Sequence, residues 1–261
     1  NTIESPKDLK KLSKDELKVL SKEIRDKILE VVSKNGGHLG GPLGAVELTL
    51  AVHYVYDTPN DKIVIDTGHQ SYPHKLVTGR KDRFHTLRQY KGICGFCNIE
   101  ESEYDVFGAG HASTAISAAL GIAKARDYLK EQHKVVAIVG DGALTAGLAF
   151  EGLNNTGYSK TDILVILNDN RMSISPNVGA ISNYLNKIVI SPGYFKLRKN
   201  TKELLSKIPG IGEEELDKLF KAQERLRVIS SEGTFFESLG FQYFGPIDGH
   251  NLAELIPALQ N

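Results

Sequence analysis

Residues 135–144, VVAIVGDGAL, decide how this chain folds. Five consecutive apolar residues, most of them β-branched, predict a strand that is buried on both faces. The strand runs into Gly140, Asp141 and Gly142, and glycines let the backbone turn tightly and approach a ligand closely. Ligands of open parallel sheets bind at the carboxyl ends of the strands. The stretch therefore predicts a buried parallel strand with a carboxylate, Asp141, at the ligand-binding edge.

Two further apolar runs, KIVID at 62–66 and ILVIL at 163–167, predict more buried strands. Helices are expected between and around them, at residues 14–34 behind a capping box at Ser13, and at 45–56, 113–129, 148–155 and 252–259. Residues 201–227 predict two helices broken at a Pro-Gly pair, 235–243 a helix or an edge strand, and 173–200 a loop-rich segment. The alternation predicts an α/β fold: a mostly parallel sheet with helices on both faces.

Composition narrows the class of protein. The 261 residues carry 32 basic and 32 acidic side chains, and the zero net charge disfavours nucleic acid or a membrane surface as partner. No apolar stretch is long enough to cross a bilayer, and the polar, lysine-rich start is unlike a secretory signal. Only two cysteines occur, which fits a reducing cytoplasm. The start at Asn1 suggests a trimmed chain.

The carboxylate at the strand end predicts a metal site. The glycines beside Asp141 would let the backbone approach a diphosphate closely. Because the Asp141 carboxylate and a diphosphate repel each other, a cation must lie between them, and Mg²⁺ prefers such hard oxygen ligands. The next strand ends in Asn168, Asp169 and Asn170, so the Asn170 oxygen reaches the same edge. Met172 would add its backbone carbonyl. The alternative is a plain strand-to-helix turn.

The Gly-Asp-Gly and Asn-Asp-Asn pair resembles the magnesium and diphosphate motif of thiamine diphosphate enzymes. Further motifs narrow the resemblance: GHQSYPHK at 68–75, SEYD at 102–105, GAGHAST at 108–114, EGLNN at 151–155, MSISPNVG at 172–179 and GPIDGH at 245–250. Together they resemble the first domain of the 1-deoxy-D-xylulose-5-phosphate synthase family, which is transketolase-like. The resemblance covers nearly the whole chain.

The resemblance implies an activity. The family condenses pyruvate with D-glyceraldehyde 3-phosphate and releases carbon dioxide, which feeds isoprenoid, thiamine and pyridoxal synthesis. It uses thiamine diphosphate and Mg²⁺ and is typically a cytoplasmic homodimer. Residues 1–261 would be its diphosphate-binding domain, incomplete at the C-terminus, without the pyrimidine-binding and C-terminal domains. This chain alone is therefore expected not to turn over.

The resemblance also implies roles for individual residues. Asp141, Asn170 and the Met172 carbonyl would bind Mg²⁺, and Gly142 and Ala143 would offer backbone contacts to the diphosphate. Others would line the cofactor: His69, Gly110, His111 and Ala112. His38 would face the substrate, where it could donate a hydrogen bond to an oxyanion or carry a proton.

The sequence departs from the family at two positions. Ala112 stands where Ser is usual, so a hydroxyl for the phosphate is missing. Pro42 follows Gly41 where Asn or Ser is usual, and proline has no backbone donor. Among the other histidines, His74 would only support the loop of His69. His53, His85 and His133 stand in no motif and are interpreted as core or surface.

Other readings stay open. Another transketolase-like enzyme, a dehydrogenase first component or a non-catalytic thiamine diphosphate module would share the metal motif. Residues 207–212, KIPGIG, resemble a DNA-binding helical hairpin, but three following glutamates would repel DNA. Cys94 and Cys97 have the spacing of a dithiol redox site. A zinc site would need four ligands, and this single pair of cysteines cannot complete one.

Overall fold

The computed structural model describes residues 3–108, 110–169 and 234–260. The chain divides into two compact units, one of residues 1–177 and 247–261 and one of residues 178–246. The predicted helices at 201–227 and the loop-rich segment at 173–200 lie outside the described residues.

The first unit is built on a parallel sheet. Its strands are β1 (Lys62–Ile65), β2 (Val135–Gly140) and β3 (Leu164–Asn168), in the order β1-β2-β3. The register pairs Ile65 with Ile138 and Gly140 with Asn168. All three predicted strands are confirmed, and their carboxyl ends lie at one edge because the strands are parallel.

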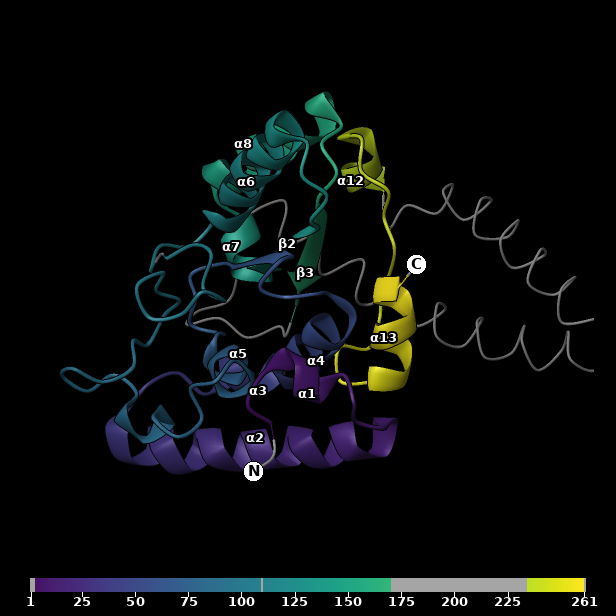
Figure 1. The fold of residues 1–261 in the computed structure, drawn as a ribbon. Helices are drawn as coiled ribbons and strands as arrows, with labels where there is room; N and C mark the ends of the chain where they lie inside the picture. Colours follow the sequence, from purple (N-terminus) through teal and green to yellow (C-terminus); the bar gives the residue numbers. More distant parts are fainter. Residues whose placement is uncertain (1–2, 109, 170–233, 261) are drawn as a thin grey trace, which may run out of the picture. The chain divides into compact units, whose positions relative to one another are not determined.

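Helices cover the sheet on both faces (Figure 1). They are α1 (Pro6–Leu9), α2 (Lys14–Asn35), α3 (Gly40–Gly44), α4 (Val46–Val55), α5 (Tyr72–Val77), η1 (Phe84–Thr86), α6 (Ala115–Leu129), α7 (Asp141–Leu144), α8 (Gly147–Ser159) and α13 (Leu252–Gln260). Ile63 and Ile138 belong to a core shared with α2, α4, α5 and α13. Alternate strand residues such as Ala137 are equally buried and point to the other face, where α6 packs on β1 and β2.

The predicted helix starts are mostly confirmed. The Ser13 capping box opens α2, and Gly36, with φ of 75°, ends it. The helix expected from Ser113 begins at Ala115 instead, because Ser113 has φ of 75°, which a helix cannot accommodate. The short helices α1, α3, α5 and α7 were not predicted, since so few residues show no periodicity.

The stretch around Pro42 forms one of these short helices, α3. Pro42 is the third residue of α3, where a helix leaves its backbone N–H groups without an internal partner. The missing donor therefore costs α3 no hydrogen bond, and Pro42 is buried.

In the second unit the described residues form α12 (Thr234–Ser238), which is shorter than the segment expected at 235–243. Irregular chain follows, and its Tyr243 ring stacks on Phe236 of α12. Among the described residues of the whole chain, no helix is long and apolar enough to span a membrane.

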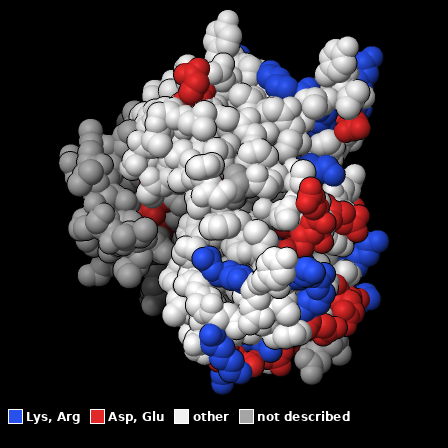
Figure 2. Space-filling model, turned by 90° about the vertical axis from the view of Figure 1, so that its left-hand side faces the viewer, with Lys and Arg blue, Asp and Glu red and all other residues white. Residues whose placement is uncertain are grey.

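Figure 2 shows Lys and Arg mixed with Asp and Glu along one side of the face it presents, while the middle of that face is largely uncharged.

Candidate functional site

The carboxyl edge of the sheet gathers acidic side chains from all three strands. Asp66 follows β1, Asp141 follows β2, and Asp169 follows β3. The register places Asp141 one position beyond the Gly140–Asn168 pair, level with Asp169. Asp141 is buried as the first residue of α7, so the Gly-Asp-Gly motif opens a helical turn. The predicted meeting of Asp141 with Asn170 and Met172 stays a prediction, because Asn170 and Met172 lie outside the described residues.

Asp66 fixes the turn that carries Gly110, His111 and Ala112. Its carboxylate accepts hydrogen bonds from the backbone N–H groups of Ser113 (2.8 Å) and Ala115 (3.0 Å) and from the Thr67 hydroxyl (3.0 Å). The Ser113 hydroxyl donates in turn to the Ala143 carbonyl at 2.6 Å. These contacts hold the exposed turn at 110–112 beside α7, which contains Gly142 and Ala143.

Gln70 links the outer strands across the middle one. Its Oε1 accepts a 2.9 Å hydrogen bond from the Asn168 side chain. A Cβ added at Gly140 would lie 3.3 Å from Nε2 of Gln70, so glycine leaves room for the crossing. The sequence assigned Asn168 and Gln70 no role of their own, and only their motifs pointed to this edge.

His69 and His38 face each other beside this edge. Their ring centroids are 5.5 Å apart, and the backbone N–H of His38 donates to the buried Tyr72 hydroxyl at 3.3 Å. Burial lowers the pKa of both imidazoles. The charge of Arg88 lowers the pKa of His38 further, and the neighbouring His38 does the same to His69. Both rings are therefore mainly neutral at pH 7.

Two features of the His69 ring bear on what it can contact. Its buried Nδ1 has no hydrogen-bond partner among the described residues, and a buried polar atom without a partner is costly. A Cβ added at Gly41 would lie 2.8 Å from Cδ2 of His69. Any side chain at position 41, including the Asn or Ser that is usual in this stretch, would therefore clash with the His69 imidazole.

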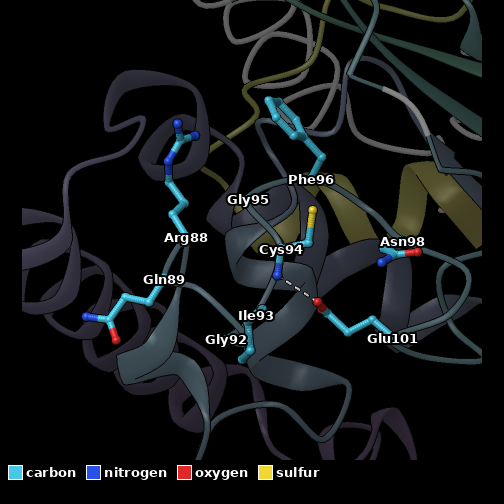
Figure 3. A pocket seen from close by; sticks show the side chains of 9 residues that line it. All are labelled: Arg88, Gln89, Gly92, Ile93, Cys94, Gly95, Phe96, Asn98 and Glu101. Atoms are coloured by element: carbon cyan, nitrogen blue, oxygen red, sulfur yellow. Dashed lines mark hydrogen bonds between the residues drawn. The ribbon is translucent and has the colours of Figure 1, made fainter.

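A pocket of about 360 Å³ lies in the chain that follows η1 (Figure 3). It is lined by Arg88, Gln89, Gly92, Ile93, Cys94, Gly95, Phe96, Asn98 and Glu101. The Phe96 ring lies 6.1 Å from the His38 ring. Arg88 stands in none of the sequence motifs, and Phe96 lies inside the Cys94–Cys97 pair, whose spacing pointed to redox chemistry rather than to this pocket.

His74 and His53 form a buried polar chain rather than isolated core residues. His53 Nδ1 lies 2.9 Å from Thr58 Oγ1, His53 Nε2 lies 2.8 Å from His74 Nδ1, and His74 Nε2 lies 2.8 Å from Asp105 Oδ1. Burial lowers the pKa of both histidines, and His74 and Arg80 hold the pKa of Asp105 well below its usual range. With both rings neutral, Thr58 donates to His53, His53 to His74, and His74 to Asp105. His53, which was expected to be a core or surface residue, is a core residue with a hydrogen-bond partner at each ring nitrogen.

The same cluster has the ligand types of a metal site. One ligand atom from each of His74, Cys97 and Asp105 lies within 4.8 Å of the others. Arg80, however, donates two hydrogen bonds to Asp105 at 2.8 and 2.9 Å, so an arginine already neutralises that carboxylate. Burial raises the pKa of the Cys97 thiol to about 12, which makes it a poor nucleophile or metal ligand.

The parallel sheet covered by helices, with acidic residues just after the carboxyl ends of its strands, is an α/β fold. A transketolase mutant from Pichia stipitis shares this fold, with a TM-score of 0.55 and 22% identity over 62% of this chain and 28% of that chain. Another from the same organism, described as a complex with xylulose 5-phosphate, gives 0.54 and 21% over 64% and 30%.

The family follows from closer relatives. The family model described as 1-deoxy-D-xylulose-5-phosphate synthase matches residues 1–261. Synthases of that name from Dictyoglomus turgidum and Alkaliphilus oremlandii are 58% and 54% identical, each over 97% of this chain. This chain belongs to the 1-deoxy-D-xylulose-5-phosphate synthase family. It spans about 40% of the length of these curated relatives.

Proposed function

We propose that this chain is the diphosphate-binding domain of an enzyme that condenses pyruvate with D-glyceraldehyde 3-phosphate to 1-deoxy-D-xylulose 5-phosphate and carbon dioxide. The observation that carries the proposal is the collection of Asp141, His69 and His38 at one sheet edge in a chain of this family. Pyrimidine-binding and C-terminal domains would complete the site, and the whole would be a cytoplasmic homodimer.

The residues present fit thiamine diphosphate and Mg²⁺. Asp141 offers a carboxylate oxygen to Mg²⁺, together with Asn170 and the Met172 carbonyl. Gly142 and Ala143 begin a helical turn whose N–H groups suit an anion. The unpartnered Nδ1 of His69 and the exposed turn Gly110, His111 and Ala112 would line the cofactor. When bound, thiamine diphosphate supplies a carbanion that adds to pyruvate and holds the electrons left by decarboxylation.

His38 is the proposed catalytic residue of this chain. Its neutral imidazole offers one N–H to a carbonyl oxygen that gains negative charge, and its other nitrogen can accept a proton. The neighbouring Arg88 lowers the pKa of His38 and so favours the neutral form at pH 7. Tyr72 holds the His38 backbone in place.

The test is the reaction itself, in the intact protein that carries this chain. Purified enzyme with thiamine diphosphate and Mg²⁺ should form deoxyxylulose phosphate from pyruvate and glyceraldehyde 3-phosphate. Its release of carbon dioxide from pyruvate should be much faster when glyceraldehyde 3-phosphate is present than when it is absent. Asp141→Asn should weaken Mg²⁺ and cofactor binding, whereas His38→Gln should lower kcat with cofactor affinity unchanged.

Two results would redirect the proposal. Ketol transfer between sugar phosphates without pyruvate would identify another transketolase-like enzyme. Cofactor binding without turnover of either substrate pair would identify a non-catalytic module. An assay limited to residues 1–261 should give no product, because the proposed site needs the other domains.

A further inference from the structure

Four buried charges lie under the pocket and outside the proposed cofactor contacts. We call Lys75, Arg80, Glu101 and Asp105 the charged cluster; each of their side chains is 9% exposed or less. Lys75 Nζ lies 2.5 Å from Glu101 Oε1, and Arg80 bonds Glu101 at 3.0 Å and Asp105 at 2.8 Å. Two cations balance two anions, so each buried carboxylate has a cationic partner.

The charged cluster holds one pocket segment at both ends. We call residues 94–98 the pocket loop. The Cys94 N–H donates to Glu101 Oε2 at 2.7 Å, and the Asn98 N–H donates to Asp105 Oδ2 at 2.8 Å (Figure 3 draws the first bond). Hydrogen bonds to ionised acceptors are about twice as strong as neutral ones. The two carboxylates therefore fix where the pocket loop begins and ends.

Phe96 stands in the middle of the pocket loop, against the proposed catalytic residue. Its ring is tilted 58° to the His38 ring at a centroid distance of 6.1 Å. A Cβ added at Gly110 would lie 3.8 Å from Cε2 of Phe96. Phe96 therefore lies close both to His38 and to the turn at 110–112. The pocket loop also rests on Arg88, which a Cβ at Gly95 would approach to 3.0 Å.

We infer that Phe96 is a positioning residue for His38, and that Glu101 and Asp105 set its place through the pocket loop. The inference rests on the proposed function, in which the His38 imidazole meets the substrate. His69 and Phe96 are the two aromatic rings beside His38 in the described part of the chain. Because these two rings border the His38 side chain, they restrict the rotamers that its imidazole can adopt.

The test compares Phe96→Ala and Phe96→Leu in the intact protein, with Tyr90→Ala as matched control. Tyr90 is an aromatic residue just before the pocket loop, but it is 92% exposed. Phe96→Ala should lower kcat roughly 10- to 100-fold, because misplacing a catalytic group has effects of that order. Affinity for thiamine diphosphate and the melting temperature should change little, since Phe96 is only partly buried. Phe96→Leu should recover most of the activity, and Tyr90→Ala should match the parent.

Glu101→Gln tests the connection to the charged cluster. It should lower kcat as Phe96→Ala does, and the double variant should be no slower than Phe96→Ala, because two residues acting through one contact are not additive. The NMR signal of the His38 ring, assigned with His38→Gln, should move in Phe96→Ala and Glu101→Gln and stay in place in Tyr90→Ala. A merely structural role of Phe96 would not move that signal at unchanged stability.

Parent-like turnover with an unmoved His38 signal in Phe96→Ala would overturn the inference, and so would additive losses in the double variant. Failure of the proposed function is seen separately. If His38→Gln kept full activity, the role of His38 and with it the need to position its ring would be refuted, while Phe96 itself had not been touched.

Discussion

The side-chain amide of Asn168, at the end of β3, donates a 2.9 Å hydrogen bond to Oε1 of Gln70, in the loop after β1, although β2 separates the two strands. The bond passes Gly140, the last residue of β2, where a Cβ would come within 3.3 Å of the Gln70 amide. The Gln70–Asn168 hydrogen bond thus joins the loop after β1 to the end of β3 across the carboxyl edge of the sheet, because Gly140 between them has no side chain.

Removing this link should loosen the edge without unfolding the sheet. We expect Gln70→Ala and Asn168→Ala each to weaken cofactor binding by about fivefold, since a neutral hydrogen bond contributes about 1 kcal/mol. Titration calorimetry with thiamine diphosphate and Mg²⁺ measures the effect. The double variant should lose no more than either single one, and independent losses would show that the two side chains do not act as a pair.

Asp66 should be needed for both stability and the turn at 110–112. In Asp66→Asn one acceptor oxygen becomes an NH₂ group that faces backbone N–H donors, and a buried donor left unpaired costs about 1–3 kcal/mol. Denaturant unfolding should show this loss, and cofactor affinity should fall with it. Asp15→Asn, at a side chain that is 91% exposed, is the control and should leave both unchanged. Parent-like stability of Asp66→Asn would contradict the role given to Asp66.

Lys75 tests whether the buried charges act as a balanced set. Lys75→Met leaves Glu101 with Arg80 as its remaining cation, and removing one partner of a buried ion pair costs about 3–5 kcal/mol. Thermal and denaturant unfolding should show a loss near the lower end of that range. Lys18→Met, which breaks an exposed pair with Asp15, should have no measurable effect. Adding Glu101→Gln to Lys75→Met should restore part of the stability, and a further loss would speak against charge balance.

The buried histidines predict acid sensitivity. Burial lowers the pKa of His74, and it lowers that of His53 well below 6.5, so the unfolded chain takes up protons that the folded chain does not. Their contribution is complete above about pH 6.5 and is lost as the pH falls toward the folded pKa values. Each histidine adds a slope of up to about 1.4 kcal/mol per pH unit. The pKa of Asp105 is also lowered by folding, so its contribution to stability is lost only below about pH 4.

Unfolding measured at pH 7.5, 6.5 and 5.5 tests this point. The intact domain should lose stability between pH 6.5 and 5.5. His53→Gln should be less stable at pH 7.5, yet its loss on acidification should be smaller, because one titrating group is gone. An equal slope in both proteins would assign the acid sensitivity to other groups.

The layered architecture could be predicted from the sequence because it depends on local patterns. Apolar runs predict the three strands and the Ser13 capping box predicts α2, since each signal lies within a few neighbouring residues. The parallel sheet then places Asp141 at the ligand-type edge. The family motifs directed attention to His38, His69 and the turn at 110–112, which the structure gathers at or beside that edge.

By itself, therefore, the sequence determined the sheet, its edge and the family. Tertiary structure decided which side chains meet there. Gln70 and Asn168 are 98 positions apart, Asp66 and Ser113 are 47 apart, and strand order and register bring them together. Hydrophobic patterns also place charges on the surface, so they could not reveal that Lys75 is fully buried. Its burial is tolerable only because folding brings the Glu101 carboxylate, 26 positions away, within 2.5 Å of its ammonium group.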